Sequence, residues 1–246
     1  MGHMLELRLQ AYTKLSSDDR ASIDRLSHKS VRHYGPRRDL VQEGDRPRSV
    51  FLMLEGWACR YKQLPDGRRQ IVAFFIPGDL CDMEIYILRE MDHSVGALTA
   101  VRAAEINQDD FDRLMLDHPR ITQALHWDLL VTVSVQREWT LNIGQRTAYE
   151  RLAHLFCELF LRLRVVGLTR GDSCDFPITQ MDLADATGLT SVHVNRMLQD
   201  MRRDGLIELH NRQLRVPDLS ALMNVAMFTS NYLHLDHEGS SLDANH

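Results

Sequence analysis

The hydrophobic positions between residues 31 and 107 come in short runs that glycine-containing turns separate. The runs 50–54 and 70–76 are rich in β-branched and aromatic residues, as strands are, and a later run at 94–106 can close the structure. About eight strands fit this span, which predicts a jelly roll. Glycine recurs every 11 or 12 residues in turn-like settings, at Gly44, Gly56, Gly67 and Gly78.

From residue 109 the hydrophobic period changes to that of helices. Asp109 or Asp110 can cap a short helix, and Pro119 suits the first position of the next. The segment 119–141 is apolar around much of its helical surface, so it needs two partners. One can be the β domain, and the other can be the same helix of a second chain. The alternation at 131–135 leaves a strand as the alternative, but its flanks carry no strand-bounding turns.

The sequence 142–144, Asn-Ile-Gly, interrupts this pattern, and we place a domain boundary there. Residues 147–166 return to apolar positions at intervals of three and four, which predicts a helix that Gly167 ends. Residues 168–177 contain a glycine and a proline and are predicted to form a loop.

Residues 178–203 contain two short amphipathic stretches around Gly188. Thr179 is a natural N-cap for the first helix, and Thr190 or Ser191 can cap the second. A glycine in a left-handed turn between two such helices indicates a helix-turn-helix. A plain helical hairpin is the alternative for the helices alone. The run 206–216 predicts a β-hairpin, or wing, and favours the DNA-binding interpretation.

The N-terminal part of the second helix would enter the major groove of DNA. Arg196 can donate two hydrogen bonds to a guanine, and Asn195 can pair with adenine if it faces the groove. Arg202, Arg203 and the wing-tip Arg212 suit phosphate contacts, which fix register. The predicted DNA-binding residues are Thr190, Ser191, Val192, His193, Asn195, Arg196, Arg202, Arg203 and Arg212.

Over residues 30–217 these segments resemble the Crp/Fnr superfamily of bacterial transcription regulators. The Gly-Asp turns at 44–45 and 78–79 resemble its cyclic-nucleotide-binding-type roll, the helix from Pro119 its dimerisation helix, and the string 189–196 its recognition helix. Arg196 matches a base-reading arginine of the family. Ser191 and Val192 stand where relatives often have arginine and glutamate, so the usual half-site sequence is not expected.

The resemblance implies an α+β fold and four regions. Residues 5–118 form an effector-type β jelly roll, 119–142 a dimerisation helix, and 143–217 a winged helix-turn-helix domain. Residues 218–246 form a C-terminal extension that is partly disordered. The implied function is that of a dimeric, sequence-specific transcription regulator in the cytoplasm. Its implied partners are double-stranded promoter DNA, a second copy of the chain and RNA polymerase.

The residues of the roll do not identify an effector. Relatives that bind cyclic AMP hold its phosphate with a Gly-Glu pair and an Arg-Ser pair, where this chain has Asp82-Met83 and His93-Ser94. Asp82 would repel a phosphate, so we expect no cyclic nucleotide bound in that way. Relatives with an iron–sulfur cluster carry N-terminal cysteines, and here none precedes Cys59. We predict no cofactor and no metal, and a roll that serves only as a dimerisation scaffold is the alternative.

An enzyme is the rival function, because eight-stranded rolls also form metal-dependent cupins. Cupin sites need clustered ligands, but residues 31–107 hold only His33 and His93, 60 residues apart. Cys81, Met83 and His93 could ligate haem or metal, yet packed side chains are the more common outcome. We therefore predict no catalytic activity.

Charge and composition change this picture little. The chain has 29 Lys and Arg against 34 Asp and Glu, a net charge of −5, so charge alone does not indicate a nucleic-acid binder. Within 191–216, five arginines face three acidic residues, a local and modest excess. No apolar run approaches the ~20 residues that span a bilayer, and we expect no membrane contact. The four cysteines lack the spacing of zinc or redox motifs, which fits a reducing compartment.

Overall fold

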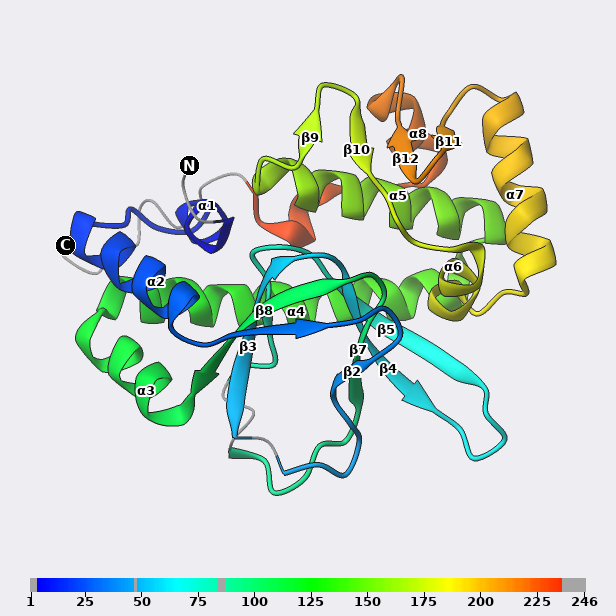
Figure 1. The fold of residues 1–246 in the computed structure, drawn as a ribbon. Coiled ribbons are helices and arrows are strands. Elements are labelled where there is room, and N and C mark those ends of the chain that lie inside the picture. The colour runs from blue at the N-terminus through cyan, green and yellow to red at the C-terminus, as the bar shows by residue number, and fades with distance from the viewer. Residues whose placement is uncertain (1–3, 47, 84–86, 236–246) are drawn as a thin grey trace. The chain divides into compact units, whose positions relative to one another are not determined.

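The computed structural model describes residues 4–46, 48–83 and 87–235 (Figure 1). The chain divides into two compact units. The first, called the roll unit, comprises residues 1–61, 74–133 and 234–246. The second, called the winged unit, comprises 62–73 and 134–233.

Eight strands of the described residues form two four-stranded sheets, which confirms the predicted roll. The strand order of one sheet is β1 (Val31–Tyr34), β8 (Val101–Asn107), β3 (Ser49–Glu55) and β6 (Leu80–Cys81). The order of the other is β2 (Asp39–Val41), β7 (Ser94–Ala97), β4 (Ala58–Gln63) and β5 (Arg69–Phe75).

The recurring glycines of the roll are turn residues, as the sequence predicts. All four adopt positive φ, where side chains are strained. At Gly56 an added Cβ would lie 2.1 Å from the carbonyl oxygen of Ala100, so no larger residue fits.

Three short helices flank the strands of the roll unit. Helix α1 (Met4–Gln10) is anchored by Arg8, which bonds Asp128 at 2.7 Å, and α2 (Ser17–Lys29) begins with a capping box at Ser16. Helix α3 (Gln108–Asp117) is capped by Asn107, whose side chain accepts from the amide of Asp110 at 2.9 Å. The predicted cap at Asp109 or Asp110 is therefore wrong. Those carboxylates lie in the first turn, where the helix dipole stabilises their negative charge.

Helix α4 (Pro119–Gln145) begins at the predicted proline. The strand alternative at 131–135 is wrong, and the predicted interruption at 142–144 does not occur. A glycine inside a helix costs only about 1 kcal/mol. The C-terminal end of α4 is also stabilised by hydrogen bonds from α5 (Ala148–Val165). The guanidinium of Arg151 donates to the carbonyl oxygens of Asn142 at 3.1 Å and Ile143 at 2.9 Å, satisfying groups that a helix end leaves open.

The winged unit is built on α5 (Ala148–Val165), which Thr147 caps. Helices α6 (Gln180–Thr187) and α7 (Ser191–Arg203) follow, and then the wing strands β11 (Glu208–His210) and β12 (Gln213–Arg215). The predicted loop at 168–177 is wrong in part, because it contains β9 (Thr169–Arg170) and β10 (Ser173–Asp175). Strand β10 pairs with β12, so the wing belongs to a four-stranded sheet of order β11-β12-β10-β9.

The C-terminal extension begins with α8 (Leu219–Val225) and the 3₁₀ helix η2 (Ser230–Leu233). Leu222 and Leu233 are buried, so these two elements contribute to the core. Residues 236–246, to which the predicted partial disorder also refers, lie outside the described residues. Among the helices that the structure describes, none has the length and apolarity needed to cross a bilayer.

A buried histidine lies where this extension packs on α5. His154 is fully buried, with its ring centroid 4.9 Å from that of Phe228 and 5.8 Å from that of Tyr232. Neither ring nitrogen has a hydrogen-bond partner among the described residues, although Nε2 lies 3.4 Å from Glu138 Oε1. Burial, assisted by the charge of Arg146, lowers the pKa of His154 to about 3. The imidazole is therefore neutral in the folded protein.

We expect this histidine to make stability fall in mild acid. The unfolded chain protonates it near its ordinary pKa of 6.5, whereas the folded protein keeps it neutral down to about pH 3. Each pH unit between these values then favours unfolding by up to about 1.4 kcal/mol. Urea unfolding of the wild type and His154→Phe between pH 7.5 and 4.5 should show the variant losing less stability. If the stabilities of the wild type and the variant fall in parallel with pH, this expectation is contradicted. The same substitution at the exposed His28 serves as control.

Candidate nucleic-acid interface

Helices α6 and α7 form the predicted helix-turn-helix. Thr179 caps α6 through a capping box with Asp182, and Gly188 ends it with φ of 67°. The side chain of Thr190 caps α7 by accepting from the amide of His193 at 3.2 Å. Thr190 is therefore bonded to its own helix, and Ser191 becomes the first helical residue.

One face of α7 is exposed and the opposite face is buried. The buried face consists of Val194, Met197, Leu198 and Met201. The exposed residues follow one another at intervals of four, three and four, as one line along a helix requires. This exposed stripe consists of Val192, Arg196, Gln199 and Arg203.

Three polar side chains of the N-terminal part of α7 have partners within the helix-turn-helix. Arg196 Nη2 lies 3.2 Å from His193 Nε2, one turn before it. Asn195 Oδ1 accepts from Gln180 Nε2 of α6 at 3.3 Å. The His193 contact orients Arg196, whereas Asn195 is engaged by α6.

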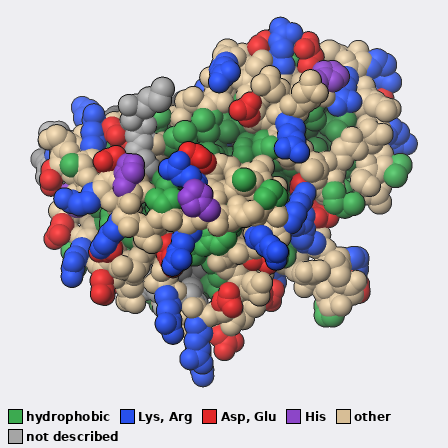
Figure 2. Space-filling model, in the orientation of Figure 1, with side chains coloured by type: hydrophobic (Ala, Val, Ile, Leu, Met, Phe, Trp, Pro, Cys, Tyr) green, Lys and Arg blue, Asp and Glu red, His purple; other side chains and the backbone are tan. Residues whose placement is uncertain are grey.

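The three arginines predicted to contact phosphates lie in different surroundings. Arg202 is half-buried, and its Nη2 donates to the carbonyl oxygen of Leu209 in the wing at 2.8 Å. Arg203 is exposed but pairs with Asp200 at 2.8 Å and with Asp204 at 3.3 Å. Arg212 is exposed at the wing turn, with φ of 62°. Figure 2 shows Lys and Arg side chains interspersed with acidic ones rather than gathered in one large patch.

An ion-pair latch joins the start of β5 to α6 within the winged unit. Arg69 bonds Asp185 through Nε at 2.8 Å and Asp182 through Nη2 at 3.0 Å. The neighbouring Gln70 donates to the carbonyl oxygen of Ala186 at 3.2 Å. The role of Arg69 is not predicted from the sequence, because no local pattern links residues more than a hundred positions apart.

Removing this latch should destabilise the winged unit. The Asp182 side chain is only 1% exposed, so Arg69→Ala leaves a buried carboxylate without one of its partners. Because Asp182 keeps its capping bonds to Thr179, we expect the free energy of unfolding to fall by about 1–3 kcal/mol in urea titrations. Arg68→Ala is the matched control, because Arg68 is 76% exposed and pairs with the nearby Asp66, and it should change stability by less than about 0.5 kcal/mol. Equal effects of the two substitutions would contradict this role.

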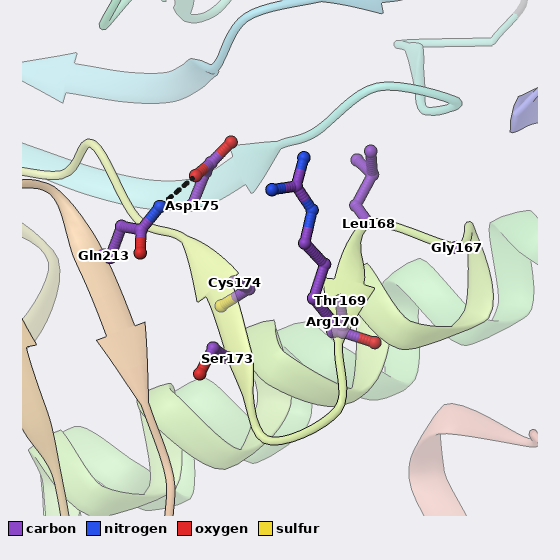
Figure 3. A pocket seen from close by; sticks show the side chains of 8 residues that line it. All are labelled: Gly167, Leu168, Thr169, Arg170, Ser173, Cys174, Asp175 and Gln213. Atoms are coloured by element: carbon purple, nitrogen blue, oxygen red, sulfur yellow. Dashed lines mark hydrogen bonds between the residues drawn. The ribbon is translucent and has the colours of Figure 1, made fainter.

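The winged sheet also carries a hollow of about 170 Å³ (Figure 3). The side chain of Gln213 donates to Asp175 at 3.2 Å beside it. It is lined by Gly167, Leu168, Thr169, Arg170, Ser173, Cys174, Asp175 and Gln213.

The roll unit holds a larger cavity of about 350 Å³ beside α4. Asp82 lies at its wall and bonds both Arg60 and His93, the latter at 2.8 Å. Burial raises the pKa of Asp82, but the bonds from His93 and Arg60 outweigh it and lower that pKa overall. Burial lowers the pKa of His93, but its bond to Asp82 outweighs this and raises it overall. The described lining residues are Arg60, Phe75, Leu80, Asp82, Met83, Ile87, Leu88, His93, Asp128, Leu129 and Thr132.

This arrangement is poorly suited to a phosphate. Arg60, the arginine among the described lining residues, is engaged by Asp82. An anion would have to displace that carboxylate or lie beside it. In the sequence, Asp82 and His93 stand near the positions where relatives hold the phosphate of cyclic AMP. The structure brings both side chains together with Arg60, whose role the sequence did not indicate. In the described part of the chain, no three His, Cys, Asp or Glu side chains cluster as metal ligands do.

Comparisons with known proteins agree with this architecture. Residues 31–118 match the family model of the cyclic nucleotide-binding domain, and residues 150–225 match that of the Crp-like helix-turn-helix domain. The chain is 31% identical over 196 residues to the nitrogen fixation regulation protein FixK of Bradyrhizobium diazoefficiens, covering 79% of this chain and 81% of that protein. It is 31% identical over 206 residues to the transcriptional activatory protein AadR of Rhodopseudomonas palustris, covering 83% and 84%.

Among solved structures, FixK2 from Bradyrhizobium japonicum superposes with a TM-score of 0.72 at 22% identity. The match covers 81% of this chain and 98% of that one, and it shows a common fold.

Proposed function

Because this chain belongs to the Crp/Fnr family of DNA-binding transcription regulators, we propose that two copies bind promoter DNA together. Each copy places the N-terminal part of α7 in one major groove, about one helical turn from its partner. The observation that carries this proposal is the exposed stripe on α7. It begins with Val192 and Arg196, and the opposite face of the helix is buried.

The polar residues among the predicted DNA-binding set each receive a role from their surroundings. Arg196 reads a base, oriented by His193. Ser191, at the start of α7, and Arg212, at the wing tip, contact phosphates. Thr190 and Asn195 act by fixing α7 through its cap and through α6.

The two remaining arginines act less directly. Arg202 holds the wing in place through the carbonyl oxygen of Leu209. Arg203 approaches the backbone of DNA with a charge that Asp200 and Asp204 already offset, so its contribution to affinity is small.

The family consists of regulators of transcription, and catalysis forms no part of the proposal. FnrL of Cereibacter sphaeroides is named a transcriptional activator and AadR a transcriptional activatory protein. By analogy, we propose RNA polymerase as the protein partner and the cytoplasm as the location.

For the roll, two roles compete. It can receive an effector in its cavity, or it can serve only as a scaffold for dimerisation. The cavity beside α4 favours the first role, with an effector that lacks a phosphate, since Asp82 occupies Arg60. A thermal shift with a candidate ligand separates the two roles. Cyclic AMP, as a phosphate-bearing ligand, should give none.

The experiment for the DNA-binding function is selection of bound duplexes from a randomised DNA pool with the full-length protein. We expect an enriched palindrome whose half-sites are centred 10–10.5 base pairs apart. Failure to enrich any sequence over several rounds would contradict sequence-specific binding.

A further inference from the structure

Val192 is an apolar side chain placed where polar ones are expected. It is the second residue of α7 and is 79% exposed, although its β-branched side chain would be more stable away from water. A single exposed apolar residue is ordinary on a protein surface. At the groove-facing start of a recognition helix, however, it determines what that part of the interface can bind.

Three polar neighbours of Val192 have partners elsewhere, and the proposed phosphate contact takes the fourth, Ser191. The side chain of Thr190 caps the helix, His193 contacts Arg196, and Asn195 accepts from Gln180. The N-terminal end of the exposed stripe therefore presents two chemical groups to DNA. One is the guanidinium of Arg196, and the other is the isopropyl group of Val192.

Val192 and Arg196 lie on one line of α7. Four residues of helix advance about 6 Å along its axis, so both side chains can reach base edges of the same half-site when α7 lies in the major groove.

The major groove contains one apolar group, the C5-methyl of thymine. Facing the polar edge of a G·C pair, an isopropyl group would displace water from donors and acceptors without replacing their hydrogen bonds. Facing a thymine, it gains a contact between two apolar groups and removes both from water.

We propose that Val192 reads the methyl group of a thymine in each half-site, near the guanine that Arg196 binds. The inference rests on the proposed DNA-binding function and adds to it the identity of one base. Its chemistry differs from hydrogen-bonded readout, because it depends on a single methyl group of the DNA.

Replacing thymine by uracil removes this methyl group and leaves base pairing unchanged. Each thymine of the selected duplex is replaced in turn, in both half-sites at once. We expect one symmetric position at which uracil weakens wild-type binding about fourfold per half-site, the effect of one buried carbon group. Val192→Ala should bind the thymine duplex correspondingly less tightly and should not distinguish thymine from uracil at that position.

Gln199→Ala is the matched control, since Gln199 lies further along the same stripe and should leave the uracil effect intact. A selected half-site that tolerates uracil everywhere, or that lacks thymine near the guanine, overturns the inference while leaving sequence-specific binding in place. Undiminished uracil sensitivity of Val192→Ala overturns it as well. Failure to select any site contradicts the proposed function itself.

Discussion

Leu130→Asp is expected to convert the protein to a monomer and to lower its affinity for specific DNA at least about 100-fold. Leu130 is 65% exposed at the middle of α4. The residues that follow it at intervals of three and four, Val133, Arg137 and Thr140, are exposed as well. This spacing is that of the seam between two paired helices.

The apolar residues on this part of α4 make a second copy the natural partner. The exposed apolar side chains of the helix are Leu129, Leu130, Val133, Leu141 and Ile143. In a dimer, a carboxylate at position 130 would be buried beside apolar side chains, which costs several kcal/mol without a partner. Two linked recognition helices gain affinity from each other by a factor of about 10²–10⁴, and a monomer forfeits this gain.

Light scattering reports the mass of the variant, and titration of a fluorescent duplex reports its affinity. Leu116→Asp is the matched control, because Leu116 is 80% exposed on α3 rather than on α4. The control should remain dimeric and bind DNA as the wild type does. If Leu130→Asp stays dimeric at the same concentrations, α4 is not the pairing helix.

Arg196→Ala is expected to weaken specific binding by about 1–3 kcal/mol and to relax one base position of the half-site. The side chain is exposed, so the substitution removes no internal packing. It removes the bidentate donor that guanine requires, and the His193 contact that orients this donor is lost with it.

Footprinting and repeated selection with the variant measure both effects. Arg203→Ala is the control on the same exposed stripe, since Asp200 and Asp204 already offset its charge. We expect the control to retain the wild-type site with little loss of affinity. A footprint of Arg196→Ala identical to that of the wild type would show that α7 is not the reading helix.

The features predicted correctly from the sequence are those that a few neighbouring residues determine. Thr179 and Thr190 cap the two helices through contacts three residues ahead, and Gly188 provides the left-handed turn between them. The turn glycines of the roll behave in the same way. The sequence offered Asp109 or Asp110 as the cap of α3 and only a loop at 168–177, whereas the structure has Asn107 as the cap and a hairpin in that loop.

The sequence by itself therefore determined the order of the main elements and the helix-turn-helix. Only the tertiary structure decided which distant residues meet. It brings Arg69 to Asp182 and Asp185, and it places Arg60 on Asp82. The physical reason is range: a cap or turn is specified by residues within one turn of chain, whereas an ion pair across the fold depends on packing that no local pattern encodes.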